Sequence, residues 1–81
     1  MKTYEVIKEE FNPCGGTQLP DNSEITEMQL DNPALYVQEQ YKHERSIEFL
    51  ATEQDGSTVI EALLEGGRKH RYTFSELSPQ R

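Results

Sequence analysis

The chain has 81 residues, a net charge of −7 and 33 % hydrophobic residues. This length suits one domain with a thin core. A strongly acidic chain is poorly suited to sequence-independent binding of nucleic acid or anionic membrane, since both are negatively charged. We therefore expect no direct binding to nucleic acid or membrane, whereas a protein partner with a basic surface is compatible with the charge.

The single cysteine, Cys14, rules out an intrachain disulfide and fits a reducing compartment. Residues 1–11 are charged throughout, unlike a signal peptide or a membrane span. These features predict a cytoplasmic protein. We expect residues 1–77 to form a single domain and residues 78–81 to form a frayed tail.

Residues 2–11 have the composition of a strand. The alternation is imperfect, because Tyr4 and Val6 would face one way and Ile7 and Phe11 the other; a twist or a bulge between the two pairs would reconcile it. The breaker-rich residues 12–23 follow as a long loop.

Long loops are often functional, and Cys14 lies inside this one. A reactive thiol needs a neighbouring base or cation, and no basic residue occurs between Lys8 and Lys42. We therefore interpret Cys14 first as an ordinary loop residue. Use of its thiol for catalysis or redox chemistry is the weaker hypothesis.

Residues 24–30 alternate in the manner of a second strand paired with the first, although the Asp21 to Glu24 spacing also resembles the start of a short helix. Asn32 and Pro33 then form a better helix start, because Asn is a good N-cap and Pro suits the first helical position. In the alternative reading, residues 33–52 form one long bent strand of a small all-β barrel.

Residues 46–77 read as three antiparallel strands in a row. Asp55-Gly56 predicts a two-residue type I′ turn, which places Phe49 opposite Ala62.

For the next turn, a two-residue loop would direct Lys69 to the core, so we predict a three-residue loop over residues 66–68 with Ile60 opposite Phe74. The predicted apolar face then contains Ile47, Phe49, Ala51, Ile60, Ala62, Leu64, Tyr72 and Phe74.

The predicted fold is α+β, with a five-stranded, mainly antiparallel sheet and one helix in the order β-β-α-β-β-β. An antiparallel sheet commonly buries one face and exposes the other. The reverse face carries three apolar residues among charged ones, and together with the loop cysteine they form the candidate interaction surface: Leu50, Val59, Leu63 and Cys14.

The sequence contains no catalytic motif, and Cys14, His43 and His70 lack the close spacing of metal ligands. We therefore expect no enzyme, metal or cofactor. The basic run at residues 68–71 alternates between two faces, and we expect Glu61 and Glu65 to neutralise it across the strands, without an aromatic platform.

Three function classes follow. The first is a small, non-enzymatic interaction or regulatory protein with a protein partner, or a homodimer formed through a sheet face or edge. The second is an acidic inhibitor that imitates nucleic acid in the basic groove of a nucleic-acid-binding protein, as some phage anti-defence proteins do. The third is a thiol-dependent protein using Cys14.

Overall fold

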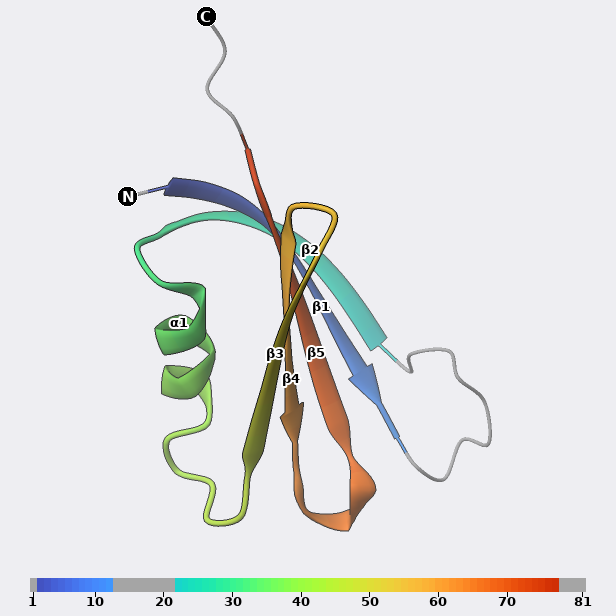
Figure 1. The fold of residues 1–81 in the computed structure, drawn as a ribbon. Helices are drawn as coiled ribbons and strands as arrows, with labels where there is room; N and C mark the ends of the chain where they lie inside the picture. The colour runs from blue at the N-terminus through green and yellow to red at the C-terminus, as the bar shows by residue number, and fades with distance from the viewer. Residues whose placement is uncertain (1, 13–21, 78–81) are drawn as a thin grey trace, which may run out of the picture.

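The computed structural model describes residues 2–12 and 22–77 (Figure 1). The predicted tail at residues 78–81 and Cys14 lie outside the described residues. The described elements, in chain order, are β1 (Lys2–Phe11), β2 (Asn22–Leu30), α1 (Pro33–Gln40), β3 (Glu48–Gln54), β4 (Ser57–Leu63), the 3-10 turn η2 (Glu65–Gly67) and β5 (Lys69–Glu76).

The five strands form one sheet in the order β2-β1-β5-β4-β3, and every neighbouring pair is antiparallel. Helix α1 lies against one face of this sheet (Figure 1). The predicted α+β fold and its element order are therefore confirmed. The all-β barrel is wrong, because β2 and β3 remain at the two margins of an unclosed sheet.

Helix α1 begins as its sequence predicts. The Asn32 Oδ1 atom accepts hydrogen bonds from the backbone N–H groups of Ala34, at 3.0 Å, and Leu35, at 3.3 Å. Pro33 occupies the first turn, where a backbone donor is not needed. This cap stops the chain from continuing as an extended strand, which is why residues 33–52 are not one strand.

Strand β1 pairs with β2 on one side and with β5 on the other, and both ladders run without a bulge. Of the two explanations offered for the imperfect alternation, the bulge is therefore wrong. The two apolar pairs of β1 belong to opposite faces, so that Val6 is buried while Ile7 and Phe11 lie on the other side. The alternative helix near residue 24 is also wrong, since β2 begins at Asn22.

The turn between β3 and β4 follows its local sequence. Asp55 and Gly56 both have positive φ, at 50° and 81°, as a type I′ turn requires. The ladder places Phe49 opposite Ala62, which confirms the predicted register.

The register between β4 and β5 differs from the predicted one by two residues. Ile60 lies opposite Tyr72, and Phe74 lies opposite Thr58. The loop has three residues as predicted, but it spans Glu65–Gly67 because the two positive φ values fall at its glycines. Arg68 is already extended, and its carbonyl accepts from the N–H of Leu64 at 2.9 Å. A two-residue shift preserves which side chains share a face.

The core lies between α1 and the sheet. Phe74 and Val37 are completely buried, and the aromatic rings of Tyr4 and Tyr36 meet Phe74 edge-to-face. Phe49 and Ile47 are only partly buried, and Ala51 is exposed, so the predicted apolar face is covered at its centre but not at the β3 margin. The buried residues are Val6, Val37, Tyr41, Ile60, Ala62, Leu64, Tyr72 and Phe74.

We predict that Phe74→Ala lowers the free energy of unfolding by about 3–5 kcal/mol, because it empties a fully buried site. Phe49→Ala removes a ring that is only partly buried and should cost less. Urea unfolding measures both, and Phe74→Leu is the milder variant if the alanine variant does not fold. Equal losses at the two positions would contradict this packing.

Candidate functional site

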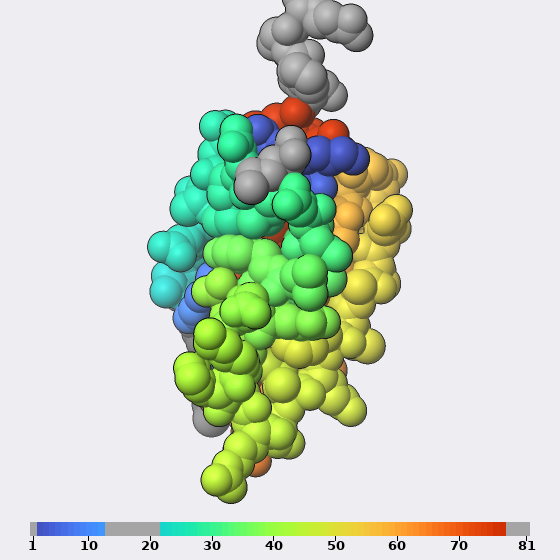
Figure 2. Space-filling model, turned by 90° about the vertical axis from the view of Figure 1, so that its left-hand side faces the viewer, coloured from blue at the N-terminus to red at the C-terminus, as the bar shows by residue number. Residues whose placement is uncertain are grey.

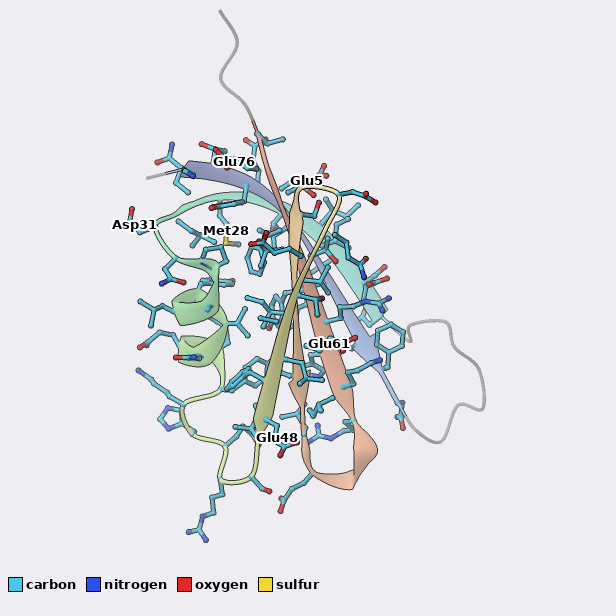
Figure 3. All side chains as sticks on the ribbon, viewed as in Figure 1. Glu5, Met28, Asp31, Glu48, Glu61 and Glu76 are labelled. Atoms are coloured by element: carbon cyan, nitrogen blue, oxygen red, sulfur yellow. The ribbon has the colours of Figure 1, made fainter. Side chains whose placement is uncertain are left out.

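One face of the sheet is turned away from α1, and we call it the open face. No other element of the described chain covers it (Figure 1). Figure 3 shows Met28 on the side of α1 and Glu61 on the opposite side. Alternation along each strand then assigns the remaining side chains to the two faces.

A row of five β-branched side chains, one from each strand, crosses the open face. Cross-strand neighbours in an antiparallel sheet have side chains on the same face and in contact range. Ile25 at one end of the row is 67 % exposed and Thr52 at the other end is also exposed, whereas the three residues between them are partly buried. Across the sheet, this β-branched row consists of Ile25, Ile7, Thr73, Val59 and Thr52.

Beside this row lies a charged cluster formed by Glu9, Arg71, Glu61 and Lys69. The Arg71 Nε atom donates to Glu9 Oε1 at 2.9 Å, and its Nη1 atom lies 3.8 Å from Glu61 Oε2. Lys69 Nζ lies 3.4 Å from Glu61 Oε2. Cross-strand neutralisation of the basic run by Glu61 is therefore confirmed. Glu65 is in the turn instead, and Lys69 has Leu63 as its cross-strand neighbour.

Phe11 completes this region. Its ring lies under both cations, with Lys69 Nζ and the Arg71 guanidinium carbon each 4.9 Å from the ring centroid. Phe11 reaches the basic run because pairing of β1 with β5 brings it next to Lys69. Stacking on the ring and bonding to carboxylates hold both cations in place.

A groove of about 640 Å³ runs along the open face between the charged cluster and the β3–β4 turn. Thr52, Val59 and Thr73 line it from the β-branched row. Glu9, Glu61 and Asp55 contribute carboxylates. The groove is thus a shallow surface with apolar methyl groups and an excess of negative charge.

The three described members of the candidate interaction surface, Leu50, Val59 and Leu63, all lie on the open face, as alternation predicts. Leu50 is 52 % exposed, and the other two are partly buried. Val59 lines the groove, whereas Leu63 lies outside it. Cys14 lies outside the described residues.

Sequence reasoning missed four residues of this surface: Ile7, Ile25, Glu9 and Phe11. Alternation within β1 did separate Ile7 and Phe11 from Val6, and alternation within β2 separates Ile25 from Met28. Their location beside β4 and β5 could not be inferred, because it depends on the pairing of β1 with β5.

A second polar group lies on the α1 side, and we call it the hydroxyl cluster. The Tyr41 hydroxyl lies 2.6 Å from His70 Nδ1 and 2.7 Å from the Tyr72 hydroxyl. In the neutral imidazole tautomer with its proton on Nε2, Nδ1 is an acceptor, so that Tyr72 donates to Tyr41 and Tyr41 donates to His70. The cluster ties the residue that follows α1 to strand β5.

Burial governs protonation in the hydroxyl cluster. It raises the pKa of Tyr41, with a further contribution from the Tyr72 hydrogen bond, and it lowers the pKa of His70. His70 is partly buried, whereas Tyr72 is 2 % exposed and belongs to the core. A neutral imidazole held as an acceptor is suited to fastening two elements together.

Within residues 2–12 and 22–77, no three His, Cys, Asp or Glu side chains gather in a way that could hold a metal ion. The only α-helix in this part of the chain has eight residues, and no helix there is long and apolar enough to cross a membrane. Comparison with protein-family models, with curated proteins and with solved structures finds no match to this chain.

We predict that acid weakens the fold through His70. Because burial lowers the pKa of His70 below its ordinary value of 6.5, the unfolded chain takes up a proton more readily than the folded chain. The contribution of His70 to the free energy of unfolding is therefore complete above pH 6.5 and decreases as the pH falls below this value. Glu10 and Glu44 oppose this shift, while Lys8 and Arg68 add to it.

The measurement is urea unfolding between pH 7 and pH 5. His70→Gln should be less sensitive to pH than the wild type in this range. His43→Gln is the matched control, because His43 is exposed, and it should retain the wild-type pH dependence. An unchanged pH dependence in His70→Gln would show that the hydroxyl cluster does not respond to acid.

Proposed function

We propose that this protein is a non-enzymatic interaction module of the cytoplasm, which binds the basic surface of a partner protein through its open face. The observation that carries the proposal is the β-branched row, which crosses all five strands without a covering element in the described chain. Ile25 and Leu50, both more than half exposed, lie on this face, and exposed apolar side chains that gather on one face are typical of an interface.

The charges support a basic partner. The chain carries a net charge of −7. At the groove, Arg71 and Lys69 balance Glu9 and Glu61, which leaves the carboxylate of Asp55 in excess. A partner with Lys or Arg side chains around an apolar centre complements this arrangement. Complementary charge speeds encounter and selects among partners, while the apolar row supplies the buried contact.

The open face is well suited to binding because it is already ordered. Arg71 is held by Glu9, Glu61 and the ring of Phe11, so its position does not have to be fixed when a partner arrives. A preorganised surface loses less conformational entropy on binding.

We predict that Ile25→Lys weakens partner binding about tenfold or more, because it places a cation at the exposed end of the β-branched row. Leu35→Lys is the matched control: Leu35 is 58 % exposed, against 67 % for Ile25, but it lies on α1. Both changes add one charge, and both sites are exposed enough to leave the fold intact.

The partner is first captured from a lysate of the source cells on the immobilised wild-type protein, then purified, and its affinity is measured for all three chains. Weak binding by Ile25→Lys together with wild-type binding by Leu35→Lys supports the open face. The proposal is overturned if Ile25→Lys binds as the wild type does, or if Leu35→Lys is the weaker binder.

A second candidate function is an inhibitor that imitates nucleic acid, and one observation favours it. Glu5 and Glu27 are direct cross-strand neighbours on the open face. Like charges in this position destabilise a sheet. A pair of carboxylates that costs stability is therefore consistent with a surface that presents negative charge to a partner. The partner's basic surface would then be one that otherwise holds nucleic acid.

For this candidate, we predict that a short DNA or RNA duplex competes with the chain for the captured partner. A Glu5→Gln/Glu27→Gln double variant should also bind more weakly than a Glu53→Gln/Glu65→Gln control, which loses the same charge outside the open face. Lack of competition by either duplex would exclude mimicry and leave the basic-partner proposal standing.

A further inference from the structure

Strand β3 forms one margin of the sheet, and no strand of the described residues pairs with the backbone groups on its outer side. Gln54 and Ser57 flank the two-residue turn and are therefore a hydrogen-bonded pair. Hydrogen-bonded and non-hydrogen-bonded pairs alternate along an antiparallel ladder. The backbone groups of Phe49, Ala51 and Glu53 thus point away from β4, toward the side where the described chain has no further strand.

The outer side of β3 is accessible. Figure 2 shows the yellow β3 segment along one margin, beside α1 rather than beneath it. Ala51 and Glu53, whose side chains project on the α1 side of the sheet, are exposed, so the helix does not cover this strand. A second strand can approach the outer groups of β3 without displacing any described element.

The composition of β3 leaves its centre less protected than that of the other edge strand, β2. Each strand carries two glutamates, but Glu48 and Glu53 lie near the ends of β3 and leave the uncharged run of residues 49–52. In β2, Glu24 and Glu27 divide the strand into shorter uncharged runs. Charged residues in mid-strand are a common means of preventing edge-to-edge pairing. Of the two edges, β3 is therefore the one open to pairing.

We propose that β3 pairs antiparallel with β3 of a second copy of this chain about a two-fold axis at Leu50, so that two five-stranded sheets join into one. A two-fold axis is the commonest symmetry of soluble dimers. This proposal concerns the sheet edge and does not rest on the function proposed for the open face.

The register follows from the side chains. With Leu50 opposite Leu50 of the partner copy, Phe49 faces Ala51 and Glu48 faces Thr52, so no carboxylate faces another. Phe49 and Ala51 both direct backbone groups outward, and they form the hydrogen-bonded pairs of the new ladder. Leu50, which is 52 % exposed, becomes a symmetric apolar contact.

Two other registers also pair the outward-pointing residues with one another. With Ala51 on the axis, Phe49 lies opposite Glu53, and with Phe49 on the axis, Leu50 lies opposite Glu48. Each exchanges the leucine contact for an apolar side chain against a carboxylate. Cross-strand apolar pairs stabilise a ladder, so the register with Leu50 on the axis is favoured.

Charge sets the conditions under which the dimer forms. Two chains that each carry a net charge of −7 repel one another, and one strand pair is a small interface. Salt screens this repulsion. We expect a monomer–dimer equilibrium that shifts toward the dimer as protein concentration and salt concentration rise.

Disulfide trapping tests the proposal at residue level. In a Cys14→Ser background, Leu50→Cys places two thiols across a non-hydrogen-bonded pair, where Cα atoms are about 4.5 Å apart, within the range of a disulfide. Thr52→Cys is the matched control on the same strand and face. In the proposed dimer its two copies are four residues apart along the ladder, or ~13 Å, beyond the reach of a disulfide.

With diamide as the oxidant, Leu50→Cys should form the linked dimer about tenfold faster than Thr52→Cys, because only the former pair lies within bonding range. Equal rates would indicate random collision and overturn the proposal. Faster linking by Ala51→Cys would overturn the register. Sedimentation of the wild-type chain in moderate salt provides a test without mutation, since a single monomeric species at all concentrations would exclude the dimer.

Discussion

Burial of Tyr72 and Phe74 on the central strand β5 is the interaction on which the rest of the structure depends. Their side chains are 2 % and 0 % exposed. Tyr36 of α1 meets both rings edge-to-face, at centroid distances of 6.4 and 6.2 Å, and Tyr4 of β1 meets Phe74 at 6.1 Å. Edge-to-face contacts of this kind add stability beyond the area that they bury. They join the N-terminal hairpin, the helix and the C-terminal meander into one unit.

This packing also explains how a helix as short as α1 is stable. Eight residues are too few for a stable isolated helix, so α1 depends on the Asn32 cap at its start and on contacts with the sheet. Beyond its last residue, Tyr41 joins the hydroxyl cluster with His70 and Tyr72. Both ends of the helix are thereby fastened, one by a local cap and the other by β5.

In the described part of the chain, a single α-helix covers one face of the sheet, and no element there covers the opposite face. Strand alternation sends the aromatic residues of β5 to the core and, from the same strand, Lys69, Arg71 and Thr73 to the open face. The alternation of side chains along β5 therefore contributes both to the buried core and to the proposed binding surface. A dimer through β3 would join two open faces on one continuous sheet. A partner with two basic sites would then gain affinity from bivalent binding without any new contact on either face.

The local sequence determined the helix and strands of this protein and which residues of each strand share one face of the sheet. The Asn32-Pro33 start and the Asp55-Gly56 turn act through residues that are neighbours in the chain, and both are formed as the sequence predicts. Alternation correctly placed Leu50, Val59 and Leu63 on the side opposite the core.

Only the tertiary structure determined which strands pair with one another and in which register. The β4–β5 register differs by two residues from the predicted one, because side-chain alternation has a period of two and cannot distinguish registers of equal parity. The insertion of β5 between β1 and β4 brings Arg71 to Glu9, which is 62 residues away in the chain. No local pattern records such a pairing, since it depends on which long-range strand contacts bury the most apolar surface once the whole sheet has formed.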